Sequence, residues 1–193
     1  MKKDIPIHVD CCLGGFLAPF AESCGRKLPI FDFRNPAVTT ISCDHHKYGV
    51  SPKGVSVVMF NNSNLRQKCF FAMSTWPGGV YASSGLLGSR TGATGVGAWV
   101  TMVHHGYKGY HDKAKEIFDG QDKLVTELKK IPEVRVIGNP VLGTVSVVSN
   151  NKNLEILTIL DLMNEKGWTL NSCQRPNAIQ FLLNYCNVRY VDQ

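Results

Sequence analysis

Residues 37–49 read Ala37-Val38-Thr39-Thr40-Ile41-Ser42-Cys43-Asp44-His45-His46-Lys47-Tyr48-Gly49, and this stretch decides the fold. Its apolar first half predicts a buried strand over residues 38–42, and Lys47 follows soon after that strand ends. Residues 5–9 predict a second strand that ends at Asp10, and residues 55–60 predict a third that is rich in β-branched side chains. Short apolar strands separated by helix-length segments indicate an α/β fold with a largely parallel sheet.

A lysine and an aspartate are expected at one edge of that sheet. Ligands of open α/β sheets bind beyond the carboxyl ends of the strands, where both Asp10 and Lys47 fall. Pyridoxal phosphate chemistry needs this pair, because a lysine amine condenses with the cofactor aldehyde while a carboxylate keeps the pyridine nitrogen protonated. We therefore predict pyridoxal 5′-phosphate as the cofactor and Lys47 as the catalytic lysine. The adjacent histidines and desolvation are expected to lower the pKa of Lys47.

Simpler roles for these residues stay open at this point. A carboxylate at a strand end, such as that of Asp10, also caps a following helix. Lys53 is a rival lysine, although its frame Ser51-Pro52-Lys53-Gly54 favours the tip of a turn. Residues 43–46 are four potential metal ligands in a row, which do not converge easily on one ion, so no metal site is expected.

The rest of the chain predicts a phosphate-binding loop and a second unit. The triplet Gly88-Ser89-Arg90, followed by Gly92, combines small residues with a cation, which is typical of phosphate loops. It lies in a loop-like segment, residues 70–95, that also contains Tyr81. Helices are predicted over residues 95–105 and about 112–130. Strands over 134–137, 144–148 and 178–183, with a helix over 154–166, indicate an α+β unit.

Composition excludes several classes of protein. The chain has 193 residues, 44% of them hydrophobic, and a formal net charge of +6, but its lysines are dispersed, so nucleic-acid binding is not expected. The seven cysteines follow no repeating pattern and are interpreted as reduced thiols of a cytoplasmic protein. No apolar run approaches the length of a membrane span or forms a signal peptide.

Several motifs resemble those of one enzyme family. They are His8-Val9-Asp10, Cys12-Leu13-Gly14-Gly15-Phe16, Phe31-Asp32-Phe33-Arg34, Val38-Thr39-Thr40-Ile41-Ser42-Cys43-Asp44, His46-Lys47-Tyr48-Gly49, Pro52-Lys53-Gly54, Gly78-Gly79-Val80-Tyr81, Gly88-Ser89-Arg90 and Lys166-Gly167-Trp168. Together they resemble the sphingosine-1-phosphate lyases, a branch of the fold-type-I pyridoxal-phosphate enzymes near the group II amino-acid decarboxylases. The strand aspartate and the His-Lys motif mark the superfamily, whereas the Phe-Asp-Phe-Arg, Gly-Ser-Arg and Lys-Gly-Trp segments point to the lyases.

The resemblance implies a fold and a set of site residues. Residues 1–111 would form the carboxyl-terminal half of the cofactor-binding large domain, and residues 112–193 a connecting helix and an incomplete small domain. Lys47 would form the imine with the cofactor, Asp10 would pair with the pyridine nitrogen, and His46 would lie near the cofactor phosphate. Gly88 and Ser89 would reach the cofactor phosphate of a neighbouring subunit, and Tyr81 would lie on the substrate side.

The resemblance also implies a reaction and a setting. A phosphorylated sphingoid base would be cleaved between C2 and C3 in a retro-aldol step, giving a long-chain aldehyde and phosphoethanolamine. Full-length relatives would act as homodimers anchored in the endoplasmic reticulum membrane and facing the cytosol.

Two features depart from the family pattern and keep alternatives open. Thr91 stands where the family usually has proline, which bears on the rigidity of that loop. Both ends of the chain look cut, so we expect a fragment truncated at both ends that binds cofactor poorly by itself. The alternatives are an amino-acid decarboxylase of the same fold and a non-catalytic homologue that acts as an interaction module.

Overall fold

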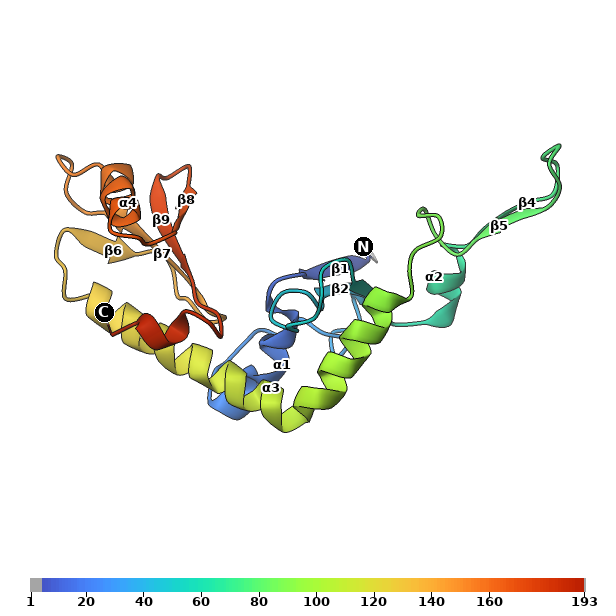
Figure 1. Cartoon of the computed structure of the whole chain (residues 1–193), viewed down its shortest axis with the longest axis horizontal. Coiled ribbons are helices and arrows are strands. Elements are labelled where there is room, and N and C mark those ends of the chain that lie inside the picture. Colours follow the sequence, from blue (N-terminus) through green and yellow to red (C-terminus); the bar gives the residue numbers. More distant parts are fainter. Residues whose placement is uncertain (1–4, 193) are drawn as a thin grey trace. The chain divides into compact units, whose positions relative to one another are not determined.

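The computed structural model describes residues 5–192, which fall into two compact units (Figure 1). The first unit comprises residues 5–16 and 28–106, and the second comprises residues 17–27 and 107–192. Each unit is described by itself below.

The first unit is built on a sheet with the strand order β1-β2-β3. All three predicted strands form: β1 (Ile7–Cys11), β2 (Val38–Asp44) and β3 (Ser56–Phe60). The pairing of β1 with β2 is parallel, whereas β3 runs antiparallel to β2. The expected parallel order therefore holds for one of the two pairings. The reason is the short connection over residues 45–55, which contains no helix, because a parallel pairing needs a longer crossover.

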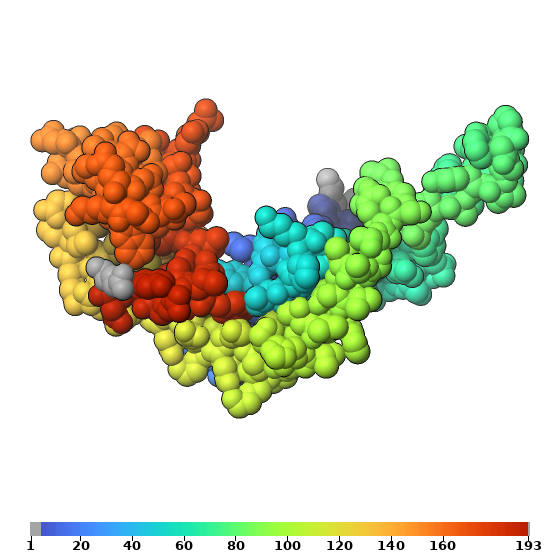
Figure 2. All heavy atoms as spheres, in the orientation of Figure 1, coloured from blue at the N-terminus to red at the C-terminus, as the bar shows by residue number. Residues whose placement is uncertain are grey.

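Residues 70–95 contain a hairpin where the sequence predicted only loop. Strand β4 (Phe71–Met73) pairs antiparallel with β5 (Tyr81–Ser83), after a short helix α2 (Ser63–Gln67). The turn at Trp76-Pro77-Gly78-Gly79 is closed by a hydrogen bond from the Gly79 N–H to the Trp76 carbonyl, 3.0 Å long. Figure 2 shows this hairpin as a narrow arm with little other chain around it.

The two helices predicted over residues 95–105 and 112–130 form one element with a break. Helix α3 spans Ala93–Leu128, but Gly106 within it has φ 59° and ψ −176°, which is not helical. Only glycine adopts such a conformation at little cost, so the break lies at the residue that tolerates it best.

The second unit begins with a short helical segment. Helix α1 (Ala18–Ala21) carries Pro19 in its first turn and runs into the 3₁₀ turn η2 (Glu22–Cys24). Gly25, with φ 80°, ends the segment in the left-handed conformation that glycine favours. In the first unit, the preceding 3₁₀ turn η1 (Gly14–Phe16) follows β1 after the turn at Cys12 and Leu13.

A sheet and one helix make the core of the second unit. The strands β6 (Val134–Val136), β7 (Thr144–Ser149), β9 (Ala178–Leu182) and β8 (Asn171–Cys173) pair in that order, all antiparallel. Helix α4 (Ile156–Glu165) packs its buried side chains Ile156 and Leu160 against Val147 and Ile179 of the sheet. A 3₁₀ turn η3 (Val188–Tyr190) follows. The predicted helix and three of these strands are thereby confirmed.

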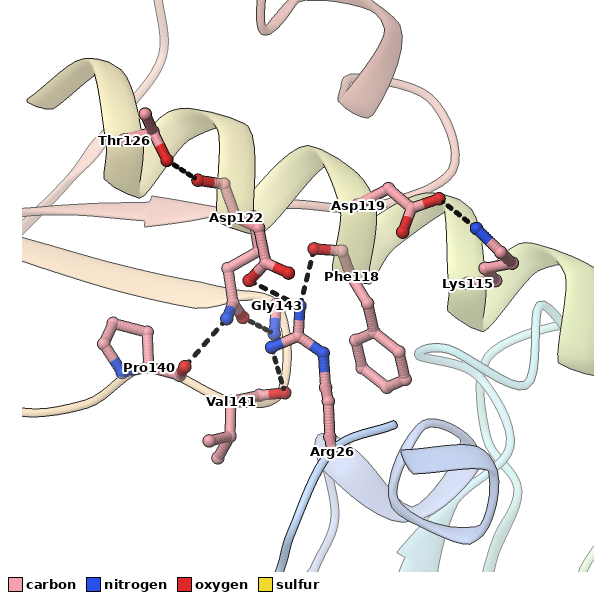
Figure 3. Close-up of polar contacts among 10 residues, drawn as sticks. Arg26, Lys115, Phe118, Asp119, Asp122, Thr126, Pro140, Val141 and Gly143 are labelled. Atoms are coloured by element: carbon pink, nitrogen blue, oxygen red, sulfur yellow. Dashed lines mark hydrogen bonds and ion pairs between the residues drawn. The ribbon is translucent and has the colours of Figure 1, made fainter. Parts of the chain in front are cut away.

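Buried polar groups fasten the loop over residues 138–143 to helix α3 (Figure 3). The Arg26 guanidinium donates to the Phe118 carbonyl at 2.6 Å, to Asp122 at 2.7 Å and to the Val141 carbonyl at 3.3 Å. The amide of Gln121, which is fully buried, donates to a loop carbonyl and accepts from a loop N–H. Among residues 5–192, no helix combines the length and the apolar character that crossing a bilayer requires.

Candidate active site

The register of the first two strands positions Asp10. Asp10 in β1 lies opposite Ser42 in β2, and the Ser42 hydroxyl donates to the Asp10 carboxylate at 3.0 Å. The backbone N–H of Cys12 donates to the same oxygen at 2.9 Å. Both bonds favour the charged form, so the pKa of Asp10 is lowered, first by the Cys12 N–H and then by the Ser42 hydroxyl. The Asp10 carboxylate is therefore ionised at neutral pH, and two hydrogen bonds fix its position near the end of β1.

Lys47 lies in the turn that follows β2, and its amine is paired. Its Nζ lies 2.8 Å from Oδ2 of Asp44, the last residue of β2, and its side chain is 33% exposed. Because the carboxylate favours the ammonium form, the pKa of Lys47 is raised, with the hydrogen bond to Asp44 as the largest cause. The expectation of a lowered pKa was wrong: the sequence suggested that cationic neighbours dominate, but the nearest charge is the anion of Asp44.

Asp44 joins this lysine to the adjacent histidine and strand. Its carboxylate accepts a hydrogen bond from the Ser56 hydroxyl of β3, the residue opposite it in the register, and lies 3.9 Å from Nε2 of His46. The Lys47 bond is the main reason why the pKa of Asp44 is lowered. The other ring nitrogen of His46, Nδ1, donates to the Val55 carbonyl at 3.0 Å. The imidazole is thereby oriented from both sides.

Cys12 connects Asp10 to the residues that follow β2. Its backbone N–H donates to the Asp10 carboxylate at 2.9 Å, and its carbonyl accepts a hydrogen bond from the N–H of Asp44 at 3.3 Å. The Asp44 carboxylate in turn holds the Lys47 amine at 2.8 Å, so Asp10 and Lys47 belong to one bonded network at the edge where the parallel strands β1 and β2 end. Sequence reasoning missed this role, although Cys12 follows Asp10 by two residues, the spacing at which an aspartate bonds to the backbone of its own turn.

The backbone around Lys47 is tightly constrained. A Cβ atom at Gly49 would lie 2.4 Å from the His45 carbonyl oxygen and 2.8 Å from the Phe16 ring, so only glycine fits there. The next residue, Val50, has φ 59°, an unfavourable conformation for a β-branched side chain. Strained backbone of this kind concentrates at functional sites. The turn that presents Lys47 is therefore maintained by its surroundings rather than by local preference.

His45 is the buried neighbour of this cluster. Its ring meets the Phe16 ring edge-on at a centroid distance of 5.1 Å, and its burial lowers the pKa of the imidazole. Within residues 5–192, its Nδ1 atom finds no hydrogen-bond partner. His45 is thus a neutral ring at neutral pH, and it adds no positive charge beside Lys47.

The other predicted site residues lie in separate parts of the unit. Tyr81 belongs to the β4–β5 hairpin, is 48% exposed and lies 6.2 Å from the Phe71 ring. Gly88 and Ser89 lie in the exposed loop before α3, where Arg90 folds back to donate to the Ser89 carbonyl at 2.8 Å. The structure therefore gathers Asp10, His46 and Lys47 into one network, whereas Tyr81, Gly88 and Ser89 belong to the hairpin and its following loop.

Comparison with known proteins identifies the family. The chain is 42% identical to the sphingosine-1-phosphate lyase of Saccharomyces cerevisiae over 194 residues, covering 100% of this chain and 33% of the yeast protein. It is 40% identical to sphingosine-1-phosphate lyase 1 of Rattus norvegicus over 190 residues, covering 98% of this chain and 33% of the rat protein. This chain belongs to the sphingosine-1-phosphate lyase family. No family model matches it.

Solved structures agree with this assignment. The sphingosine-1-phosphate lyase of Burkholderia pseudomallei K96243 superposes with a TM-score of 0.91 at 38% identity, covering 97% of this chain and 42% of the other. The glutamate decarboxylase of Lactobacillus brevis superposes with a TM-score of 0.78 at 22% identity, covering 97% and 44%, which concerns the fold alone. The predicted fold class, part of a fold-type-I architecture, is thereby confirmed. The chain spans about a third of the length of the curated lyases it matches.

Proposed function

We propose that this chain is the lysine-bearing part of a pyridoxal-phosphate-dependent lyase that cleaves phosphorylated sphingoid bases. The observation that carries the proposal is the bonded network in which the Cys12 backbone joins the Asp10 carboxylate to Asp44, the partner of the Lys47 amine. These two groups are what the cofactor requires at its ring nitrogen and its aldehyde. Family membership supports the choice of reaction, because the matched relatives carry the name sphingosine-1-phosphate lyase.

The residues present fit the cofactor. Lys47 would hold it through its amine and Asp10 through an ion pair to the ring nitrogen, with His46, Gly88 and Ser89 proposed near phosphate groups. When bound, the cofactor supplies an electron sink for the pair left by carbon–carbon cleavage. Asp10 suits its role because its lowered pKa keeps it ionised at neutral pH.

Lys47 has to release a proton before it can react. Its amine is held as an ammonium by Asp44 at 2.8 Å, and only the neutral amine is a nucleophile. The Asp44 carboxylate stabilises the ammonium form, so this ion pair has to open before the proton can leave. Asp44 thereby sets how readily Lys47 exchanges with an incoming substrate amine.

A second copy of the chain is proposed as a partner. The hairpin and the loop that follows it expose large apolar side chains, including Trp76, Val80 and Leu86, which are 53%, 81% and 104% exposed. Exposed large apolar side chains that gather on one segment mark interaction sites. A homodimer that covers this arm would bring Gly88 and Ser89 to the site of the neighbouring subunit, and Tyr81 to the substrate side. A reducing, cytosolic setting suits the free thiols, such as exposed Cys69 and Cys186.

Trapping the cofactor on its lysine tests the site. The chain is incubated with pyridoxal phosphate, reduced with borohydride, digested and analysed by mass spectrometry. We expect a phosphopyridoxyl group on the peptide that carries Lys47, and none there in Lys47→Ala. Lys53→Ala is the matched control because Lys53 lies in the same connection, and it should leave the labelling unchanged. Labelling at Lys53 in preference to Lys47 would contradict the assignment.

Product analysis tests the reaction. Sphingosine 1-phosphate, glutamate and an aromatic amino acid are offered separately to the chain with cofactor. Release of phosphoethanolamine and a long-chain aldehyde from the first supports the proposal. Release of carbon dioxide from either amino acid instead identifies a decarboxylase. Labelling of Lys47 without turnover of any substrate favours a cofactor-binding homologue that acts through a partner.

A further inference from the structure

A thiol, an imidazole and a carboxylate form a second cluster, in the other unit of the chain. Sγ of Cys24, the last residue of η2, lies 3.8 Å from Nε2 of His111 on α3. Nδ1 of the same imidazole lies 3.5 Å from Oδ1 of Asp112. None of these residues belongs to the strand ends that carry Lys47. Their order is that of a nucleophile, a base and a group that orients the base.

The carboxylate of Asp112 selects the useful form of the histidine. A carboxylate accepts hydrogen bonds, so it favours the imidazole that carries its proton on Nδ1. The lone pair of Nε2 is then free to accept the S–H of Cys24. Two aromatic rings hold the imidazole in place, Phe20 edge-on at 6.1 Å and Tyr107 stacked at 6.3 Å. The base is therefore oriented by packing as well as by charge.

The charges around the thiol are mixed, and one cation lies near it. Lys115, one helical turn beyond His111, interacts electrostatically with Cys24 and is also paired with Asp119. Asp112 is paired in turn with Lys108. Because both carboxylates are paired with lysines, their repulsion of the negative charge that develops on the attacking sulfur is limited. Cys24 is partly buried and the His111 side chain is 28% exposed, so small reagents can reach both groups.

We propose that Cys24 is a modification site that forms mixed disulfides with low-molecular-weight disulfides, with His111 as its base. In this step the Cys24 sulfur attacks one sulfur of the small disulfide while Nε2 of His111 takes the S–H proton. The new bond joins Cys24 to the attacked sulfur. The bond between the two sulfurs of the reagent breaks, and the second sulfur leaves as a thiolate that recovers the proton. The reagent is the oxidant, and an added thiol reverses the reaction.

Site-resolved labelling of the whole chain tests this proposal. The chain is exposed to oxidised glutathione at neutral pH, quenched at intervals with acid, and each cysteine peptide is quantified by mass spectrometry. Cys69 and Cys186 are exposed and serve as internal references. General-base assistance predicts that Cys24 reacts about ten-fold faster than either reference, although it is less exposed. In urea, the rates of the three thiols should converge.

Two variants test whether His111 acts as a base or only packs against Cys24. His111→Gln keeps a polar side chain of similar reach but cannot take the proton, so the rate at Cys24 should fall to within about two-fold of the references. Asp112→Asn changes a surface group and should reduce the rate by a smaller factor while the far-ultraviolet spectrum is unchanged. A Cys24 that reacts no faster than Cys186 in the wild type overturns the proposal. So does an unchanged rate in Asp112→Asn, which decides the matter where His111→Gln does not fold.

Discussion

Replacing Asp44 with asparagine should make Lys47 a better nucleophile. The variant removes the charge 2.8 Å from Nζ but keeps an oxygen that can accept the Ser56 hydroxyl. The folded state raises the pKa of Lys47 and lowers that of Asp44, so the pair is stable at neutral pH and is lost at either extreme. The side chains are 33% and 15% exposed, and pairs of this kind contribute up to about 1 kcal/mol. That energy is about a five-fold factor in an equilibrium constant, so the neutral fraction of Lys47 should rise by about that factor.

Competitive acetylation measures this change directly. The chain is treated with limiting acetic anhydride at neutral pH, and the rate at each lysine is read by peptide mass spectrometry. Lys47 should acetylate about five-fold faster in Asp44→Asn, with Lys53 as the internal reference. Asp32→Asn is the matched control, because it removes a carboxylate whose partner is Arg34, at 2.9 Å. A rate at Lys47 that stays constant or falls in Asp44→Asn, or that rises equally in Asp32→Asn, would refute the reasoning.

Three further outcomes are expected from packing and burial. Gly49→Ala should lower the free energy of unfolding, measured in urea, by about 1–3 kcal/mol, because the new Cβ would lie 2.4 Å from the His45 carbonyl oxygen. Gly88→Ala is the control and should have little effect, because a Cβ there meets open space. Gln121→Leu should cost about 2 kcal/mol or more, because a partly buried carbonyl and a buried N–H of the facing loop lose their partner. Equal urea midpoints would contradict this. Burial raises the pKa of Tyr48 to about 12. The free energy of unfolding should therefore fall as the pH rises from the ordinary tyrosine pKa toward that value, because the unfolded chain loses this proton first. The absorbance of the Tyr48 phenolate should appear together with unfolding.

The strands that carry the site could be predicted because their sequences are unambiguous. In β2 the buried residues Val38, Ile41 and Cys43 alternate with threonines and a serine, and β1 has Asp10 next to its last residue. Parallel pairing of two such strands puts their ends at one edge, which is how Asp10 and Lys47 were coupled. What the residue types do not reveal is the partner of each charge. Asp44 and Lys47 are three residues apart in the sequence. They pair because of the shape of the turn that continues to Gly49 and Val50, and that shape is visible only in the structure.

The hairpin and the helix break left no comparable signal in the sequence. Strand β4 has all three residues exposed and β5 has two of three, so neither shows the alternation of buried and exposed side chains that identifies a strand. Their pairing depends on the turn at residues 76–79, whose Pro-Gly-Gly sequence suits many loops. Gly106 lies among residues of helical pattern, and a glycine inside a helix often remains helical. The residue types around Gly106 therefore do not indicate that it leaves the helical conformation with φ 59°.

The proposed site has two parts that depend on different segments of the fold. Asp10 and Lys47 depend on the sheet, whereas the other proposed residues depend on the hairpin and the loop after it, so a substitution in one part should leave the other unchanged. Every group that holds Asp10 comes from β1, β2 or the Cys12 turn, and Lys47 is held by the last residue of β2. The reactivity of Lys47 therefore depends on the three-stranded sheet and the turns that follow β1 and β2. Gly88 and Ser89 depend on an exposed loop, and Tyr81 on a hairpin with apolar surface to cover. Replacing Val80 and Leu86 with serine should then alter self-association, measured by sedimentation, and leave the acetylation rate of Lys47 unchanged. A changed rate at Lys47 in that variant would mean that the hairpin and the sheet edge act as one site.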